Sequence, residues 1–232
     1  MVDQLKIMET KLKRKSKPGG KAQLLNLPRN WLHQALLYMD RTELLVRVLI
    51  EIGIFVGLLY PLSLFLQSGI FDWRALTLSF ILVHTVNWII NGNWWALMMF
   101  TFPGIRNAGE KATCEYLSVM TVRLKRSQSI AALAVYGSPA RGQWHDKSDL
   151  DLRILREKGF FHGLTAAVIT MRERLIAFIS GQPVDLFLAD SPQFLMKMRK
   201  DEKPIVLLKR GKEAEAYFLD EEVTIVNTWP AR

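Results

Sequence analysis

The stretches GSPARG (residues 137–142) and SDLDL (residues 148–152) decide how this chain is expected to fold. Residues 131–136, AALAVY, form a short apolar run that is typical of a buried strand. Ser138 is a preferred helix N-cap and Pro139 suits the first helical position, so the chain is expected to turn there from strand to helix. Outward-pointing backbone N–H groups at such a turn favour phosphate, which makes Gly137 and Ser138 candidate phosphate ligands.

Carboxylates recur on the strands that follow this turn. Residues 148–155 alternate polar and apolar side chains, which predicts a strand with Asp149 and Asp151 on one face. Two carboxylates about 4 Å apart would repel by roughly 4 kcal/mol at an effective dielectric of 20, so a cation between them is expected. Mg²⁺ with a substrate phosphate suits such ligands. Residues 183–188, PVDLFL, predict a second apolar strand that carries Asp185, and together the three carboxylates indicate a two-metal phosphoryl-transfer site.

Gly-Ser, then Ala-Arg-Gly, then Ser-Asp-x-Asp-Leu resemble the signature of the nucleotidyltransferase superfamily related to DNA polymerase β, particularly its minimal nucleotidyltransferases. The resemblance covers about residues 105 to 210 and implies an α/β (α+β) fold with a mixed β-sheet. It implies two Mg²⁺ ions, with Mn²⁺ as the alternative, and a nucleoside triphosphate as substrate. The implied catalytic metal ligands are Asp149, Asp151 and Asp185, and the implied nucleotide-binding residues are Gly137, Ser138, Arg141 and Ser148.

Two alternative interpretations give these residues no role in catalysis or nucleotide binding. The three aspartates can be solvated strand residues, and Arg141 can pair with Asp146 as easily as with a phosphate. The chain carries one cysteine, Cys114, which excludes an internal disulfide and a cysteine-rich zinc site.

The first 103 residues differ in character from the rest. Half of the chain is hydrophobic although 23% of it is charged, so the two kinds of residue are expected to be segregated. Residues 48–66 and 75–102 are apolar enough to cross a bilayer core, and Glu51 is the only charged residue in either stretch. These stretches predict a transmembrane hairpin, with a buried soluble core as the alternative. Arg47 stands one helical turn before Glu51 and is expected to pair with it.

Polar residues on the second apolar stretch predict that one of its faces packs against another helix. His84, Asn87 and Asn91 recur at helical spacing and are expected to hydrogen-bond to the first crossing or to another subunit, so a homo-oligomer through these helices is one expectation. Asn91-Gly92-Asn93 allows a break, which leaves a straight and a broken helix both open. Residues 26–40 predict an amphipathic helix, either at a membrane interface or packed on a soluble partner.

The net charge and the positions of the basic residues predict the binding partners and the orientation in the membrane. The net charge of +9 favours anionic partners, which include nucleotide, nucleic acid and anionic membrane lipid. Basic residues flank both ends of the hairpin, which places the N-terminus and the last domain in the cytoplasm and the protein in the plasma membrane. The expected organisation is a mobile basic tail (residues 1–22), an interfacial helix with two transmembrane helices (residues 23–103), and a nucleotidyltransferase domain (residues 104–232). This last domain is expected to be soluble when cut free, unless the tryptophan-rich segment around Trp94 and Trp95 packs against its sheet.

The expected function is transfer of a nucleoside monophosphate from a triphosphate to an acceptor, with release of pyrophosphate. The acceptor is a lipid-linked or glycan-precursor molecule or a protein. An antitoxin-type nucleotidyltransferase that acts on a partner protein and a non-catalytic membrane nucleotide sensor are the alternatives. A nucleic-acid substrate is disfavoured, because little chain follows residue 210 to bind a template.

Overall fold

The computed structural model describes residue 31 and residues 39–102, 104–196 and 203–224 of the 232-residue chain. The predicted basic tail (residues 1–22) and most of the predicted amphipathic helix (residues 26–40) lie outside the described residues.

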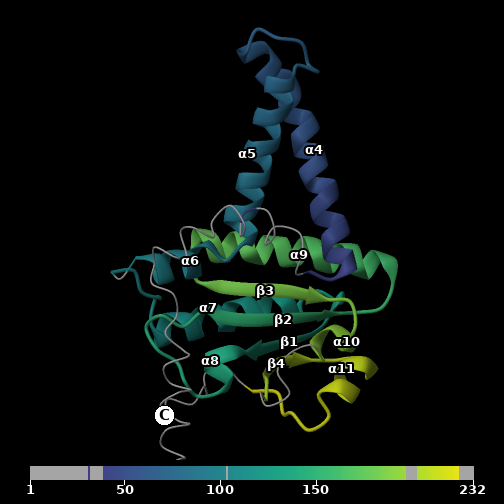
Figure 1. The fold of residues 1–232 in the computed structure, drawn as a ribbon. Helices are drawn as coiled ribbons and strands as arrows, with labels where there is room; N and C mark the ends of the chain where they lie inside the picture. Colours follow the sequence, from purple (N-terminus) through teal and green to yellow (C-terminus); the bar gives the residue numbers. More distant parts are fainter. Residues whose placement is uncertain (1–30, 32–38, 103, 197–202, 225–232) are drawn as a thin grey trace, which may run out of the picture.

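A mixed four-stranded sheet forms the centre of the C-terminal half (Figure 1). The strands are β1 (Ile130–Tyr136), β2 (Leu150–Arg156), β3 (Val184–Ala189) and β4 (Ile205–Lys209), in the order β3-β2-β1-β4. β1 is antiparallel to β2 and β4, and β2 is parallel to β3. The predicted α/β class with a mixed sheet is thereby confirmed. The strand predicted over residues 148–155 begins later, at Leu150.

Helices cover the two faces of this sheet differently. α7 (Glu110–Lys125) and α9 (Phe160–Ile179) pack on one face, where Leu133, Leu152 and Leu186 are buried in the larger core cluster. The other face carries α10 (Pro192–Leu195) and α11 (Lys212–Tyr217), which bury a smaller cluster. After Gly211 the chain forms α11, and Val223 makes only an isolated bridge to Val206.

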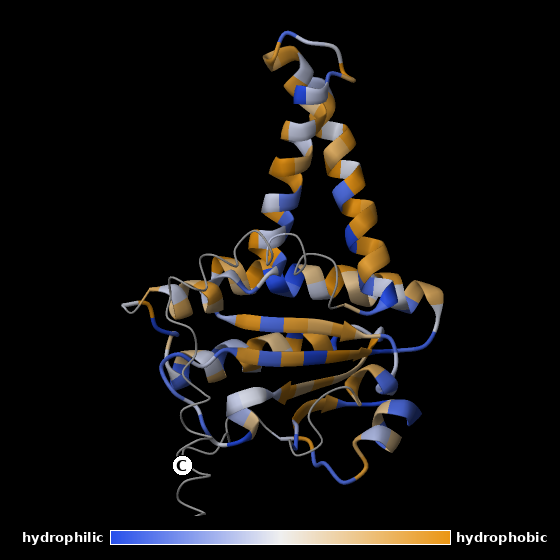
Figure 2. Cartoon of the chain, in the orientation of Figure 1, coloured by the Kyte–Doolittle hydropathy of each residue, from blue (hydrophilic) through white to orange (hydrophobic). Residues whose placement is uncertain are grey.

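Two apolar helices project from the sheet domain. α4 (Arg41–Phe65) and α5 (Trp73–Asn91) are about 37 Å and about 28 Å long at 1.5 Å per residue, which compares with a bilayer core of about 30 Å. Both are long and apolar enough to cross a membrane. Only 11% of the apolar window of α4 and 28% of that of α5 is buried, unlike the core helix of a soluble protein. Figure 2 shows hydrophobic residues along most of the length of both helices.

The second apolar stretch is broken rather than straight. α5 ends at Asn91, and a separate helix, α6 (Trp94–Thr101), follows. Asn93 between them has φ 50° and ψ 52°, a left-handed conformation that cannot continue a right-handed helix.

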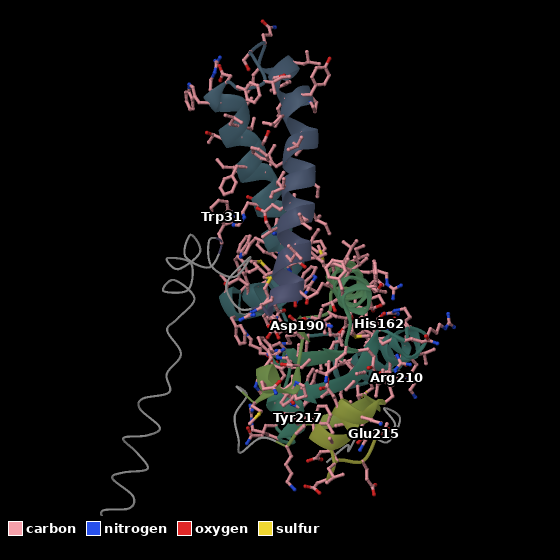
Figure 3. The ribbon with its side chains drawn as sticks, turned by 90° about the vertical axis from the view of Figure 1, so that its right-hand side faces the viewer. Trp31, His162, Asp190, Arg210, Glu215 and Tyr217 are labelled. Carbon is pink, nitrogen blue, oxygen red and sulfur yellow. The ribbon has the colours of Figure 1, made fainter. Side chains whose placement is uncertain are left out.

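The polar face of α5 packs on α4, as predicted. His84 Nδ1 lies 2.7 Å from Glu51 Oε1, and the Asn87 amide donates to Glu51 Oε2 at 2.7 Å. The ring of Trp31 lies edge-on to His84, with centroids 4.4 Å apart, beside the hairpin in Figure 3. The expected partner of Arg47 was wrong, because Arg47 donates to Glu43 at 2.5 Å and Glu51 takes its partners from α5.

The start of α4 belongs to the sheet domain. Asp40 caps the helix by accepting from Arg41 N, and its other oxygen accepts from Asp190 N at the base of the hairpin (Figure 3). Glu43 is fully buried and accepts from Leu188 N of β3 at 2.8 Å. Val46 joins the larger core cluster. Helix α4 therefore begins at Arg41, directly after the capping residue Asp40, rather than where the apolar run begins at Val48.

Candidate active site

The sheet brings the three predicted carboxylates together at one end. Asp149 directly precedes β2, Asp151 is its second residue, and Asp185 is the second residue of β3. The parallel register pairs Asp151 with Asp185, and the antiparallel register pairs Asp151 with Tyr136, the last residue of β1. Because alternate residues of a strand share a face, Asp149 and Asp151 lie on the same side of the sheet.

The clustering changes the acidity of the central carboxyl group. Burial, and then the negative charges of Asp149 and Asp185, raise the pKa of Asp151 to about 7. Arg153 opposes the shift without cancelling it. Without a cation, Asp151 therefore holds a proton over much of the range in which an isolated aspartate is ionised.

Gly137 fits against this carboxyl group only because it has no side chain. A Cβ atom at this position would lie 2.1 Å from Asp151 Oδ2, far inside contact distance, and Gly137 has φ 78°. The predicted cap at Ser138 was wrong in position: α8 (Gly137–Ala140) starts two residues earlier than expected, after Tyr136, and has no side-chain cap. The predicted strand-to-helix turn after β1 is present.

The other two predicted nucleotide-binding residues lie on the loop between α8 and β2. Ser148 is buried, and its hydroxyl accepts from His145 N at 3.0 Å, so it shapes the turn that leads into Asp149. Arg141 is exposed at the end of α8, with its Nε 3.5 Å from Gln143 Oε1. Asp146, the alternative partner considered for Arg141, is 3.3 Å from Arg106.

Arg153 belongs to the site although the sequence interpretation passed over it. It follows Asp151 at strand spacing, and its guanidinium donates to Asp185 Oδ2 at 3.2 Å and to the Asp185 carbonyl at 2.8 Å. The same group lies 4.8 Å from the centroid of the Phe187 ring. The alternation Asp149, Asp151, Arg153 was a visible signal for this position.

Asn93 reaches the site from the break between α5 and α6, which follows the two apolar helices. Its Nδ2 donates to Asp149 Oδ2 at 3.3 Å, across 56 residues of sequence. The sequence indicated a break at this asparagine but contained no signal for its contact with Asp149.

The oxygen-rich site suits a hard divalent cation, although its carboxylates are engaged in this conformation. Among the residues that the structure describes, no group of three or more His, Cys, Asp or Glu side chains is arranged as a ready metal-binding set. Asp185 is held by Arg153, and Asp149 by Asn93. The donor chemistry nevertheless fits Mg²⁺, which prefers oxygen ligands such as carboxylates. Burial and the negative charges of Asp149 and Asp185 raise the pKa of Asp151, and a bound cation would offset that repulsion.

The fold and this site define a mixed α/β protein with an acidic cluster at one end of its sheet and a pair of apolar helices before it. No protein-family model matches the chain, and a search of curated proteins found no match either.

Proposed function

We propose that this protein is a membrane-anchored, Mg²⁺-dependent nucleotidyltransferase whose sheet domain resembles the DNA polymerase β-related superfamily. The observation that carries the proposal is the register that sets Asp185 beside Asp151, with Asp149 on the same strand face. Gly137 at the preceding strand-to-helix turn lies against Asp151, where a larger residue does not fit.

The proposed reaction forms a bond between an acceptor oxygen and the α-phosphorus of a nucleoside triphosphate, and it breaks the bond to pyrophosphate, which leaves. Asp149 and Asp151 would hold the metal ions, and Asp185 would complete the site near the attacking oxygen. Bound Mg²⁺ would neutralise the negative charge of the phosphates. Arg153 orients Asp185 through one hydrogen bond to its carboxylate and one to its backbone carbonyl. Gly137 and Ser138 would restrain the leaving phosphates, with Arg141 nearby on the exposed loop.

The hairpin supports an acceptor that is itself at the membrane. α4 and α5 are long and apolar enough to span a bilayer, and they join the sheet domain without a long linker. Confinement of this kind raises the effective concentration of a lipid-linked or membrane-protein acceptor, into the millimolar range for short tethers. In the proposed topology the N-terminus and the sheet domain lie in the cytoplasm.

A non-catalytic membrane nucleotide sensor is the second candidate, and one contact favours it. Arg153 already neutralises Asp185, the carboxylate that a catalyst would need nearest the attacking oxygen. A sensor would bind nucleotide with this pair intact, whereas a catalyst would have to share Asp185 between Arg153 and a metal ion.

The test uses the full-length protein in lipid vesicles with Mg²⁺, each of the four labelled nucleoside triphosphates and a membrane extract as the source of acceptor. We expect pyrophosphate release and transfer of label in the wild type, and background rates in Asp149→Asn and Asp151→Asn. Asp146→Asn is the matched control, because Asp146 is exposed on the same loop and paired with Arg106, and it should keep the wild-type rate.

Three outcomes would count against parts of the proposal. Near wild-type turnover in either site variant would overturn the metal assignment. Nucleotide binding without pyrophosphate release would support the sensor. Extraction of the protein by alkaline carbonate, without detergent, would refute the transmembrane anchor.

A further inference from the structure

The break between α5 and α6 directs one side chain toward the carboxylate site. Asn93 is the residue before α6, the position at which an asparagine side chain commonly caps a helix. Here the side chain makes no cap hydrogen bond to α6 and instead donates to Asp149 Oδ2. The left-handed backbone conformation at Asn93 is what turns the chain from α5 into α6 at this point.

The orientation of the Asn93 amide follows from its partner. An ionised carboxylate only accepts hydrogen bonds, so the amide nitrogen rather than the oxygen faces Asp149. The oxygen of the same Asn93 amide, Oδ1, then takes no part in the contact with Asp149. It is buried and has no hydrogen-bond partner among the described residues. Buried polar atoms are nearly always paired, so an unpaired oxygen beside a proposed metal ligand indicates an O–H donor that binds there.

Helix α6 is held firmly enough to keep Asn93 in place. Trp95 Nε1 donates to the Phe178 carbonyl at the end of α9 at 2.7 Å, and the Trp94 ring meets Trp88 edge-on at 5.3 Å. Lys147 Nζ donates to the Met99 carbonyl at 3.0 Å. Figure 1 shows α6 at the end of the sheet where β3 begins, which is the end that carries the carboxylates.

We infer that Asn93 is a positioning residue of the carboxylate site. Its amide N–H holds Asp149 in the direction needed to bind a divalent cation, and its Oδ1 would accept a hydrogen bond from a water molecule at the loaded site. The inference rests on the proposed function and deepens it, because it makes the membrane hairpin contribute a side chain to the site.

The rival explanation is that Asn93 is present only because asparagine tolerates the left-handed conformation. Two substitutions separate the explanations. Asn93→Gly keeps the backbone conformation and removes the amide. Asn93→Asp also tolerates the conformation but places a negative charge beside Asp149. Gln67→Gly is the matched control, because Gln67 also carries an amide at a positive φ (49°) but lies in the connection between α4 and α5.

The readout is the melting temperature of the full-length protein in detergent, measured against Mg²⁺ concentration without substrate. We expect Asn93→Gly to fold and to need about 10-fold or more Mg²⁺ for half of the stabilisation, as is typical when an outer partner of a metal ligand is lost. Asn93→Asp should melt lower than the wild type without Mg²⁺ and gain more from it. Gln67→Gly should keep the wild-type Mg²⁺ midpoint.

A wild-type Mg²⁺ midpoint in Asn93→Gly would overturn the inference and leave the proposed function standing. If the wild type itself showed no response to Mg²⁺ or to Mg²⁺ with nucleotide, the proposed function and this inference would both fail.

Discussion

Gly137 is the residue whose replacement the site tolerates least. Two separate constraints meet there, namely a positive φ and a space that Asp151 already fills. Gly142 shares only the first constraint, since it has φ 65° but nothing lies within 4 Å of the position its Cβ would take.

Gly137→Ala should therefore destabilise the protein more than Gly142→Ala, which should cost only the roughly 1–2 kcal/mol of a left-handed alanine. Gly137→Ala should also displace Asp151 and abolish stabilisation by Mg²⁺, whereas Gly142→Ala should keep it. Denaturant unfolding of both variants with and without Mg²⁺ measures the two effects. Equal losses in both variants would show that Asp151 does not constrain position 137.

The raised pKa of Asp151 predicts how stability depends on pH without divalent cations. Between pH about 4 and about 7 the folded protein binds a proton that the unfolded chain has released, so stability falls as the pH rises through this window. The slope is at most about 1.4 kcal/mol per pH unit. Asp151→Asn removes the titration, so the difference between wild type and variant isolates it. Because Mg²⁺ competes with the proton, its stabilising effect should grow from pH 5 to pH 8. A difference that does not vary with pH would contradict the prediction.

At the scale of elements, an ion-paired cluster covers the edge of β3 that no other strand pairs with. Glu43 of α4 accepts from Leu188 N, and Arg174 of α9 donates to the Leu186 carbonyl and to Glu43. All of these groups are buried, and Arg47 completes the set. An edge strand that would otherwise present free backbone groups is thus paired by side chains from two helices.

Glu43→Gln should cost about 3–5 kcal/mol, because it removes a buried carboxylate that pairs with both Arg47 and Arg174. Glu213→Gln is the control, since its pair with Lys158 is exposed and such pairs contribute at most about 1 kcal/mol. Chemical denaturation of the detergent-solubilised protein measures both. A loss below about 1 kcal/mol in Glu43→Gln would mean that the cluster does not hold the edge of β3.

At the scale of the whole molecule, the hairpin and the sheet domain share a core. The predicted boundary at residues 103 and 104 would remove Asp40, Glu43 and Val46 from the domain. A cut at this boundary would also remove Asn93, so Asp149 would lose the hydrogen bond that it accepts from the Asn93 amide. Cutting there exposes the edge of β3 together with part of the larger core.

A chain that begins at Gly104 is therefore expected to aggregate or to unfold without a cooperative transition, in contrast to the soluble domain that the sequence suggested. Replacing only residues 54–81 with a short polar linker should give a soluble, folded protein, because the lower halves of α4 and α5 remain. Circular dichroism and thermal melts of both proteins decide the point. A cooperative transition in the chain from Gly104 would show that the hairpin is dispensable for folding.

The sequence alone predicted what depends on local pattern. Alternation at residues 148–155 indicated a strand with Asp149 and Asp151 on one face, the apolar run around Asp185 predicted β3, and uninterrupted hydrophobicity predicted the two long helices. Asp40 with Glu43 three residues later was a readable capping pattern, and it would have placed the start of α4 correctly.

Only the tertiary structure decided which distant groups meet. Asp151 pairs with Asp185, which is 34 residues away, and Asn93 contacts Asp149, which is 56 residues away. Glu43 accepts a hydrogen bond from Leu188 N, which is 145 residues away. Local propensity carries no information about strand order or about the direction in which a broken helix resumes. Those contacts follow from the order β3-β2-β1-β4 and from the docking of α4 and α6 against α9 and β3, where buried charges must find partners.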